Sequence, residues 1–246
     1  MHAALRVIFR LARWCIGAAV AAAIAWLAIA GARADEPIQV DALLLTGLDV
    51  SQSLSPEDIR LEVEGIALAI QSPSVLAAIQ RGEHGRIGFA VYLWAEGRDM
   101  PLVAPWRVIA TADDAAIVAA ELLAATTDLA AVQRRAGQLT NLADSLLNAA
   151  ALLQAAPFQA QRLVVNIVTD GAPTMKEFAV PAARAALLAT GATINGMIVS
   201  GTDETAEYFR VGVAGGRGAF VYTVSQAESL VYAFRRKFVL DMAMME

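Results

Sequence analysis

The stretch LLLTGLDVSQSLSPED, residues 43–58, contains an apolar strand, a polar turn and the start of a helix. Ser55 fits the N-cap position of that helix, Pro56 fits the first helical position, and Asp58 completes a capping box. A buried strand that leads through a short turn into a capped helix is the first half of a βαβ unit. The stretch therefore predicts an α/β fold, and the rest of the chain continues the pattern.

Apolar runs of strand length alternate with amphipathic stretches of helix length from residue 38 onward. The predicted strands cover 38–48, 85–95, 100–109, 162–170, 192–201 and 218–224. The predicted helices cover 56–71, 111–126, 141–156, 180–191, 203–214 and 225–241. This alternation predicts one domain with a doubly wound, mostly parallel sheet and helices on both faces, a Rossmann-like architecture in which 100–109 returns beside 85–95 as a hairpin.

Two later helices also carry start signals. Thr111 with Asp114 forms a second predicted capping box, and Ser225 with Glu228 is expected to cap the last helix. The basic run FRRKF, residues 234–238, is expected to form the exposed end of that helix, where positive charge suits the helix dipole.

The N-terminus has the pattern of a secretory signal peptide. Residues 1–34 contain no acid and four arginines, and an apolar run over 14–31 precedes the small-residue sequence Ala32-Arg33-Ala34. We expect cleavage after Ala34, which leaves a mature domain of residues 35–246 in the periplasm or outside the cell. The alternative is an uncleaved anchor, since the apolar run is almost long enough to span a bilayer.

Charge and cysteine content exclude several classes of protein. The 246-residue chain has a formal charge of −5, and loss of the four signal-peptide arginines would change it to −9. An acidic domain is a poor candidate for nucleic acid or for an anionic membrane surface, so contact with a membrane is expected only through an uncleaved signal. The single cysteine, Cys15, lies in the signal, so the mature domain would fold without a disulfide.

The turn after the first strand carries more oxygen ligands than helix capping requires. Asp49, Ser51 and Ser53 alternate in this turn, before the residues that cap the helix. Asp170 directly follows the apolar strand 162–170, and Thr140 follows an irregular stretch, 128–139, just before a helix. Alone, each has an ordinary explanation: a solvated loop, an Asp-Gly turn, and an N-cap formed by Thr140.

Topology brings these residues together. In a sheet of order 3-2-1-4-5-6, strands 1 and 4 are neighbours at the point where the winding reverses, and ligands bind outside the carboxyl ends of the strands there. Strand 38–48 is the first strand and 162–170 is the fourth. Hard divalent cations take oxygen ligands, so the sequence predicts a cation site at these two strand ends.

The residues Asp49-x-Ser51-x-Ser53, Thr140 and Asp170 resemble the metal-ion-dependent adhesion site of von Willebrand factor type A domains. The stretches GLDVSQSLSPED, AAPF, ATINGMIV and GGRGAFV are similar to an exported bacterial subfamily of unknown function. The approach to Thr140, Gly137-Gln138-Leu139, departs from the usual small, glycine-rich sequence.

The resemblance implies a binding function that uses Mg²⁺ or Mn²⁺. It implies that Ser51, Ser53 and Thr140 contact the metal directly, while Asp49 and Asp170 act largely through water. It also implies that a protein partner offers an acidic side chain to complete the metal's ligands.

Two alternatives to this function stay open, and catalysis is not expected. The site could be vestigial in a type A scaffold that binds its partner through another face, or it could belong to a Mg²⁺-dependent phosphohydrolase. After the signal, the only histidine is His84, which lies in a turn at the opposite end of the predicted sheet, so a serine-hydrolase triad is not expected. The glycines of 212–220 follow a helix and precede a strand, the reverse of a phosphate-binding loop.

Overall fold

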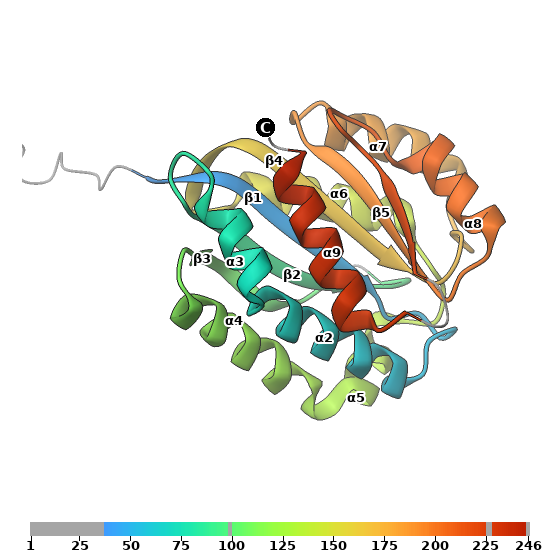
Figure 1. The fold of residues 1–246 in the computed structure, drawn as a ribbon. Coiled ribbons are helices and arrows are strands. Elements are labelled where there is room, and N and C mark those ends of the chain that lie inside the picture. Colours follow the sequence, from blue (N-terminus) through green and yellow to red (C-terminus); the bar gives the residue numbers. More distant parts are fainter. Residues whose placement is uncertain (1–36, 98–99, 225–227, 245–246) are drawn as a thin grey trace, which may run out of the picture. The chain divides into compact units, whose positions relative to one another are not determined.

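The computed structural model describes residues 37–97, 100–224 and 228–244 (Figure 1). The predicted signal peptide and its cleavage site lie outside these residues. Six strands in the described part form one sheet in the order β3-β2-β1-β4-β5-β6, which confirms the predicted fold class. Their bounds are β1 Ile38–Asp49, β2 Ile87–Trp94, β3 Leu102–Ile109, β4 Phe158–Thr169, β5 Thr193–Val199 and β6 Val221–Val224.

The centre of the sheet is the parallel pair of β1 and β4. Their register runs from Ile38 opposite Phe158 to Leu48 opposite Val168. β4 therefore begins four residues before the predicted strand 162–170, because the long β1 provides pairing partners over its whole length. The other pairs are parallel except for β2 with β3, which form the predicted antiparallel hairpin.

Helices cover both faces of the sheet (Figure 1). One face is covered by α2 Pro56–Ile70, α3 Pro73–Gln80, α4 Ala112–Ala125, α5 Leu129–Ala136 and α9 Leu230–Ala243. The other face is covered by α6 Leu142–Gln154, α7 Val180–Leu188 and α8 Asp203–Tyr208, which continues into the π-helical turn η3 Phe209–Val213. Two short 3₁₀ turns, η1 Thr126–Asp128 and η2 Glu177–Ala179, complete the described helical segments.

Local start signals explain where the first helices begin. Both predicted capping boxes are present: Ser55 with Asp58 at the start of α2, and Thr111 with Asp114 at the start of α4. Each box satisfies backbone N–H groups that have no partner inside the helix. Because the cap of α2 is complete without them, the oxygens just upstream of Ser55 are free for another role.

The segment 128–139, predicted to be irregular, is mostly helical. Asp128 caps α5 by accepting a hydrogen bond from Ala131 N at 3.1 Å, and the helix ends at Ala136. A second unpredicted helix, α3, begins after Ser72, whose hydroxyl accepts from Val75 N. Both helices have eight residues, too few for a hydrophobic period to stand out in the sequence.

The predicted caps of two other helices were wrong. Asn141, not Thr140, caps α6: its side chain accepts from Asp144 N, which leaves the Thr140 hydroxyl available. The last helix begins at Leu230 after Ser229, whereas the predicted cap Ser225 lies outside the described residues. Glu228 does not act as a cap residue, since its carboxylate accepts a hydrogen bond from Tyr222 Oη at 2.7 Å.

One described stretch, Ala112–Ala136, is long and apolar enough to cross a membrane. In the structure it is broken into α4, η1 and α5, and α4 packs in the core through Ala115, Val118 and Leu122. Only 28% of the apolar window is buried, and Ile117 and Leu123 of α4 are exposed, so packing against the sheet accounts for part of its apolar character.

Candidate metal centre

The predicted site residues meet at the carboxyl ends of β1 and β4. Asp49 is the last residue of β1, and Ser51 and Ser53 lie in the turn before α2. Asp170 follows the last residue of β4. Thr140 comes from the loop between α5 and α6, and it hydrogen-bonds to the β1–α2 turn.

Four of the five side chains form one chain of hydrogen bonds. The Thr140 hydroxyl donates to Ser51 Oγ at 3.2 Å, and Ser51 Oγ lies 3.2 Å from Ser53 Oγ. The Ser53 hydroxyl then donates to Asp170 Oδ1 at 3.0 Å. Three hydroxyls and a carboxylate from three separate segments are therefore within direct contact of one another.

Asp49 lies beneath this chain and holds the turn in place. It is fully buried, with Oδ1 accepting from Ser51 N at 2.8 Å and Oδ2 accepting from the Thr169 hydroxyl at 2.6 Å. Burial raises the pKa of Asp49 to about 6; the hydrogen bonds from Thr169 and Ser51 oppose this effect, and the charge of Asp170 adds to it. The carboxylate of Asp170 is thus close enough to Asp49 to raise its pKa by charge repulsion.

A hollow of about 510 Å³ opens above these residues. Its lining residues are Ser51, Gln52, Ser53, Gln138, Leu139, Thr140, Asp170, Gly171, Ala172 and Thr174. The described lining includes one carboxylate and neither lysine nor arginine, so its charge favours a cation. Ser51 and Thr140 are nearly fully buried at its floor, whereas Ser53 is exposed and Asp170 is partly exposed.

The donor set suits a hard divalent cation. Neutral hydroxyls and carboxylates are ligands for Mg²⁺ and Mn²⁺, which commonly keep several waters. No group of three or more His, Cys, Asp or Glu side chains that could hold a metal occurs among the described residues, so a zinc site of the usual kind is not formed there. The residues at the site therefore fit Mg²⁺ or Mn²⁺ better than they fit Zn²⁺.

Three supporting residues were not predicted from the sequence. Thr169 donates to Asp49, and Thr174 ties down the third segment: its hydroxyl accepts from Thr140 N at 2.9 Å, and its N–H donates to Thr140 O at 3.1 Å. Glu96, after β2, accepts from Gln138 N at 3.0 Å through Oε2. The only signal in the sequence was position, since Thr169 ends the strand β4 and Glu96 closely follows β2.

The loop that approaches Thr140 differs from the family pattern but is well braced. Gly137 has a φ of 94°, a backbone conformation that residues other than glycine rarely adopt. Glu96 then holds the backbone of Gln138, and Gln52 N donates to Gln138 O at 3.0 Å. The departure at Gln138 and Leu139 therefore leaves Thr140 next to Ser51.

His84 lies far from this site in the fold, as predicted. Its backbone N–H donates to Asp41 Oδ1 at 2.8 Å, near the start of β1, whereas the site lies at the end of that strand. Trp94 is completely buried, and the Trp106 ring donates to Leu152 O at 3.2 Å. Trp94 thus packs in the core, and Trp106 is fastened to the end of α6.

Solved structures of low sequence identity share this fold. Proximal thread matrix protein 1 from the mussel byssus, described with a zinc-occupied MIDAS motif, aligns with a TM-score of 0.58 and 19% identity over 85% of this chain and 49% of that chain. A von Willebrand factor type A protein from Catenulispora acidiphila aligns with a TM-score of 0.54 and 16% identity over 82% of this chain and 43% of that one.

A shorter relative is covered almost completely. The conserved hypothetical protein BatB from Bacteroides thetaiotaomicron aligns with a TM-score of 0.51 and 14% identity over 82% of this chain and 98% of that chain. The chain thus spans about half or less of the mussel and Catenulispora proteins, and nearly all of BatB. At these identities the comparisons establish the fold. No curated protein matches the sequence significantly.

The sheet order and the solved relatives show a von Willebrand factor type A-like fold. Residues 39–246 match the family model described as "Protein of unknown function (DUF1194)", and the chain belongs to this family.

Proposed function

We propose that the protein is an exported interaction domain that binds a protein partner through a divalent metal ion. The observation that carries the proposal is the hydrogen-bonded chain from Thr140 through Ser51 and Ser53 to Asp170 at two adjacent strand ends. Three segments of the sequence converge there on a hollow without basic residues in its described lining. A cation can replace the hydrogen bonds among these oxygens with metal–oxygen bonds.

Each residue would have a defined role toward the metal. Ser51, Ser53 and Thr140 would be direct ligands, since their hydroxyls line the hollow. Asp170 would hold metal-bound water from the partly exposed side. Asp49, buried beneath Ser51, would orient that residue and add negative charge from below, the role that outer groups commonly have in metal sites.

The charge balance indicates the kind of partner. A divalent ion held directly by neutral hydroxyls, with two carboxylates further back, keeps part of its positive charge. An acidic side chain from another protein would complete the ligands and neutralise that charge. The open hollow gives such a side chain access, so the metal would link the two proteins.

Mg²⁺ and Mn²⁺ are the proposed ions, and the proposed function is not catalytic. The described hollow offers oxygen donors and neither imidazole nor thiol, the ligands that zinc prefers. The mussel protein holds zinc in its MIDAS motif, so Zn²⁺ belongs in the same titrations.

Export rests on the sequence of residues 1–34. Sequencing the N-terminus of the protein recovered from a cell-envelope fraction tests it. We expect Asp35 as the first residue, and an N-terminus upstream of residue 14 would instead mean that the apolar segment is kept.

Metal-dependent capture of a partner tests the proposed function. Full-length protein is immobilised and exposed to cell-envelope extract in Mg²⁺ or in EDTA, with Thr140→Ala as the site variant. Ser74→Ala is the matched control, because Ser74 is an exposed helical serine outside the site. We expect a bound protein that EDTA releases and that only Thr140→Ala fails to hold.

Two results would contradict the proposal. Capture that is equal in EDTA and Mg²⁺ would favour a type A scaffold with a vestigial metal site. Mg²⁺-dependent hydrolysis of a phosphate ester, abolished by Asp170→Asn, would favour the phosphohydrolase alternative.

A further inference from the structure

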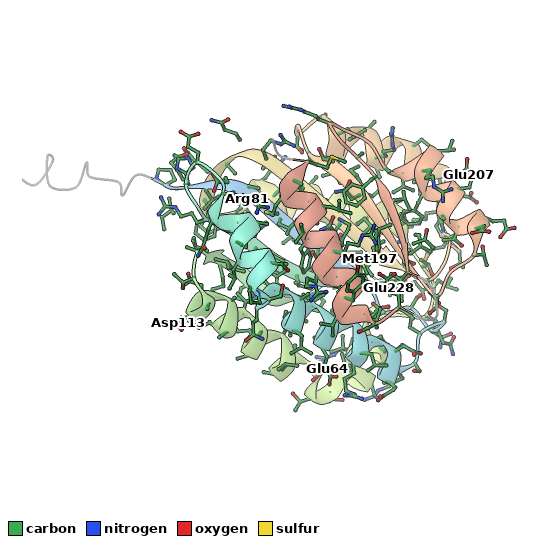
Figure 2. All side chains as sticks on the ribbon, viewed as in Figure 1. Glu64, Arg81, Asp113, Met197, Glu207 and Glu228 are labelled. Carbon is green, nitrogen blue, oxygen red and sulfur yellow. The ribbon has the colours of Figure 1, made fainter. Side chains whose placement is uncertain are left out.

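A second cluster of polar side chains is buried between the central strands of the sheet and α9. Thr46, Asn166 and Asn195 lie in register across β1, β4 and β5, and each is at most 2% exposed. They point to the face that α9 covers, where Met197 of β5 also lies (Figure 2). α9 adds Lys237 and Asp241 to this row.

The basic run 234–238 is therefore not the exposed helix end that the sequence predicted. It lies in the middle of α9, and Lys237 is 1% exposed while its neighbour Arg236 is exposed. Lys237 and Asp241 are one helical turn apart, so both face the sheet. Burying a lysine and an aspartate together costs free energy, because both ions lose their hydration. The structure must therefore offset this cost or use the pair for another purpose.

One carboxyl group bridges the lysine amine and an asparagine amide. Lys237 Nζ contacts Asp241 Oδ1 at 2.5 Å, and it also donates to Asn166 Oδ1. The Asn166 amide nitrogen donates to Asp241 Oδ2 at 2.8 Å, and the Asn195 amide holds Asp241 Oδ1 at 3.0 Å. Asp241 thus touches the nucleophilic nitrogen of Lys237 and the amide nitrogen of Asn166 with its two oxygens.

Burial works against the charged forms of this pair. The Phe220 ring centroid lies 4.5 Å from Lys237 Nζ, and Phe234 and Phe238 are buried on the same helix. Burial lowers the pKa of Lys237 and raises the pKa of Asp241, while their mutual attraction opposes both shifts. A neutral amine has a free electron pair, and a neutral carboxyl can hand on a proton.

We propose that Lys237 and Asn166 form an intramolecular amide cross-link, with Asp241 as the catalytic residue. The electron pair of Lys237 Nζ attacks Asn166 Cγ to form the new C–N bond. Asp241 takes the proton that Nζ loses and delivers a proton to Asn166 Nδ2. The old C–N bond breaks, ammonia leaves, and Asp241 returns to its starting state. The reaction needs no oxidant, metal or added reactant.

The cross-link would fasten the last helix to a central strand. It joins residues 71 positions apart, closing the β5, β6 and α9 region onto β4. β4 ends one residue before Asp170, so the bond would stabilise the strand that presents this side chain. In a domain without a disulfide it would restrict the unfolded chain in the way a disulfide does.

Mass spectrometry of the full-length protein tests the cross-link. We expect an intact mass lower than the sequence mass of the same processed chain by one molecule of ammonia. Trypsin should release residues 163–176 joined to the peptide that begins at Lys237, because trypsin does not cleave after an acylated lysine. A wild-type protein of full mass, with free 163–176 and cleavage after Lys237, would overturn the proposal and leave a plain buried ion pair.

Variants separate the reaction from the fold. Lys237→Met removes the nucleophile and Asp241→Asn removes the proton acceptor, so both should have the full sequence mass. Lys176→Met is the matched control, because Lys176 is the only other lysine in the chain and pairs with Asp144 on the surface. It should keep the ammonia loss. Loss of the cross-link in Lys176→Met, or its retention in Asp241→Asn, would contradict the proposed roles, and the wild-type mass decides the matter if a variant fails to fold.

Discussion

Ser53 and Asp170, 117 positions apart in the sequence, are joined by a hydrogen bond of 3.0 Å between the serine hydroxyl and the aspartate carboxylate. This contact closes the turn after β1 against the turn after β4. The neighbouring contacts of Ser51 bring Asp49 and Thr140 to the same point. The geometry is that of a preformed oxygen site, and its consequences can be measured.

Metal binding should weaken in acid. The pKa of Asp49 is raised to about 6, mainly by burial, so a proton competes with the metal below that pH. We expect the Mg²⁺ affinity to be constant from pH 7 to 8 and to fall by about tenfold per unit well below pH 6. Calorimetric titrations across this range check the prediction. An affinity that does not change between pH 7 and pH 5 would contradict it.

Thr169→Val should shift this pH dependence upward. The Thr169 hydroxyl donates to Asp49 at 2.6 Å and favours the ionised carboxylate. Its removal should raise the pKa of Asp49 further, so that metal binding begins to weaken at a higher pH. The control is Thr223→Val on an exposed position of β6, which should leave the pH profile unchanged. Equal profiles for the two variants would refute the assigned role of Thr169.

Glu62→Leu should stabilise the fold at neutral pH. Both carboxylate oxygens of Glu62 are buried and have no hydrogen-bond partner among the described residues. Burial, together with the charges of Asp49 and Asp170, raises the pKa of Glu62 well above 4.5. We expect the variant to gain about 1–3 kcal/mol of unfolding free energy at pH 7.

The gain should depend on pH in a defined direction. Because the folded pKa lies above the unfolded one, Glu62 binds a proton more tightly in the folded state, and stability is lost as pH rises above 4.5. The advantage of Glu62→Leu over wild type in urea unfolding should therefore grow from pH 4.5 to pH 7. Glu64→Leu, on the more exposed side of α2 (Figure 2), is the control and should change little. An advantage that shrinks with pH would refute this account.

Gly201→Ala should weaken metal binding although Gly201 is not one of the proposed metal-site residues. A Cβ at Gly201 would lie 2.5 Å from Ile198 Cγ2 and 2.6 Å from the backbone oxygen of Asp170, closer than real contacts allow, so the backbones of Gly201 and Asp170 must move apart. We expect weaker metal binding together with a loss of about 1–3 kcal/mol in stability. Gly212→Ala is the matched control and should bind metal like the wild type, because no atom lies within 4 Å of a Cβ at that position. A Gly201→Ala protein with wild-type metal affinity would contradict the expected coupling between Gly201 and the metal site.

Sequence patterns were sufficient for the sheet and for the convergence of the site. The mostly apolar second halves of β1 and β4 mark strands buried at the centre, and the order of elements then fixes their adjacency. Thr140 was predicted at the site from its resemblance to a family motif, while its expected role as a cap was taken by Asn141. Choosing between two adjacent polar residues requires backbone geometry that a sequence does not contain.

The buried charges show where sequence reasoning stops. Lys237 lies in a run of basic residues, and the pattern alone does not tell which of them faces the core. Glu62 likewise occupies a helix rich in acids, yet it is 1% exposed. Burial of Lys237 depends on partners such as Asn166 and Asp241, which only the fold brings together, whereas Glu62 is buried without a hydrogen-bond partner among the described residues.

The central claim is that the oxygens at the ends of β1 and β4 hold one divalent cation. Isothermal titration of full-length protein at pH 7.5 with Mg²⁺, Mn²⁺ and Zn²⁺ tests it most directly, with Ser51→Ala beside the Ser74→Ala control. We predict saturable binding of one Mg²⁺ or Mn²⁺ ion by the wild type and by Ser74→Ala, and a loss of at least about tenfold in affinity for Ser51→Ala. No binding heat at millimolar Mg²⁺ or Mn²⁺, or equal binding by all three proteins, would contradict the claim.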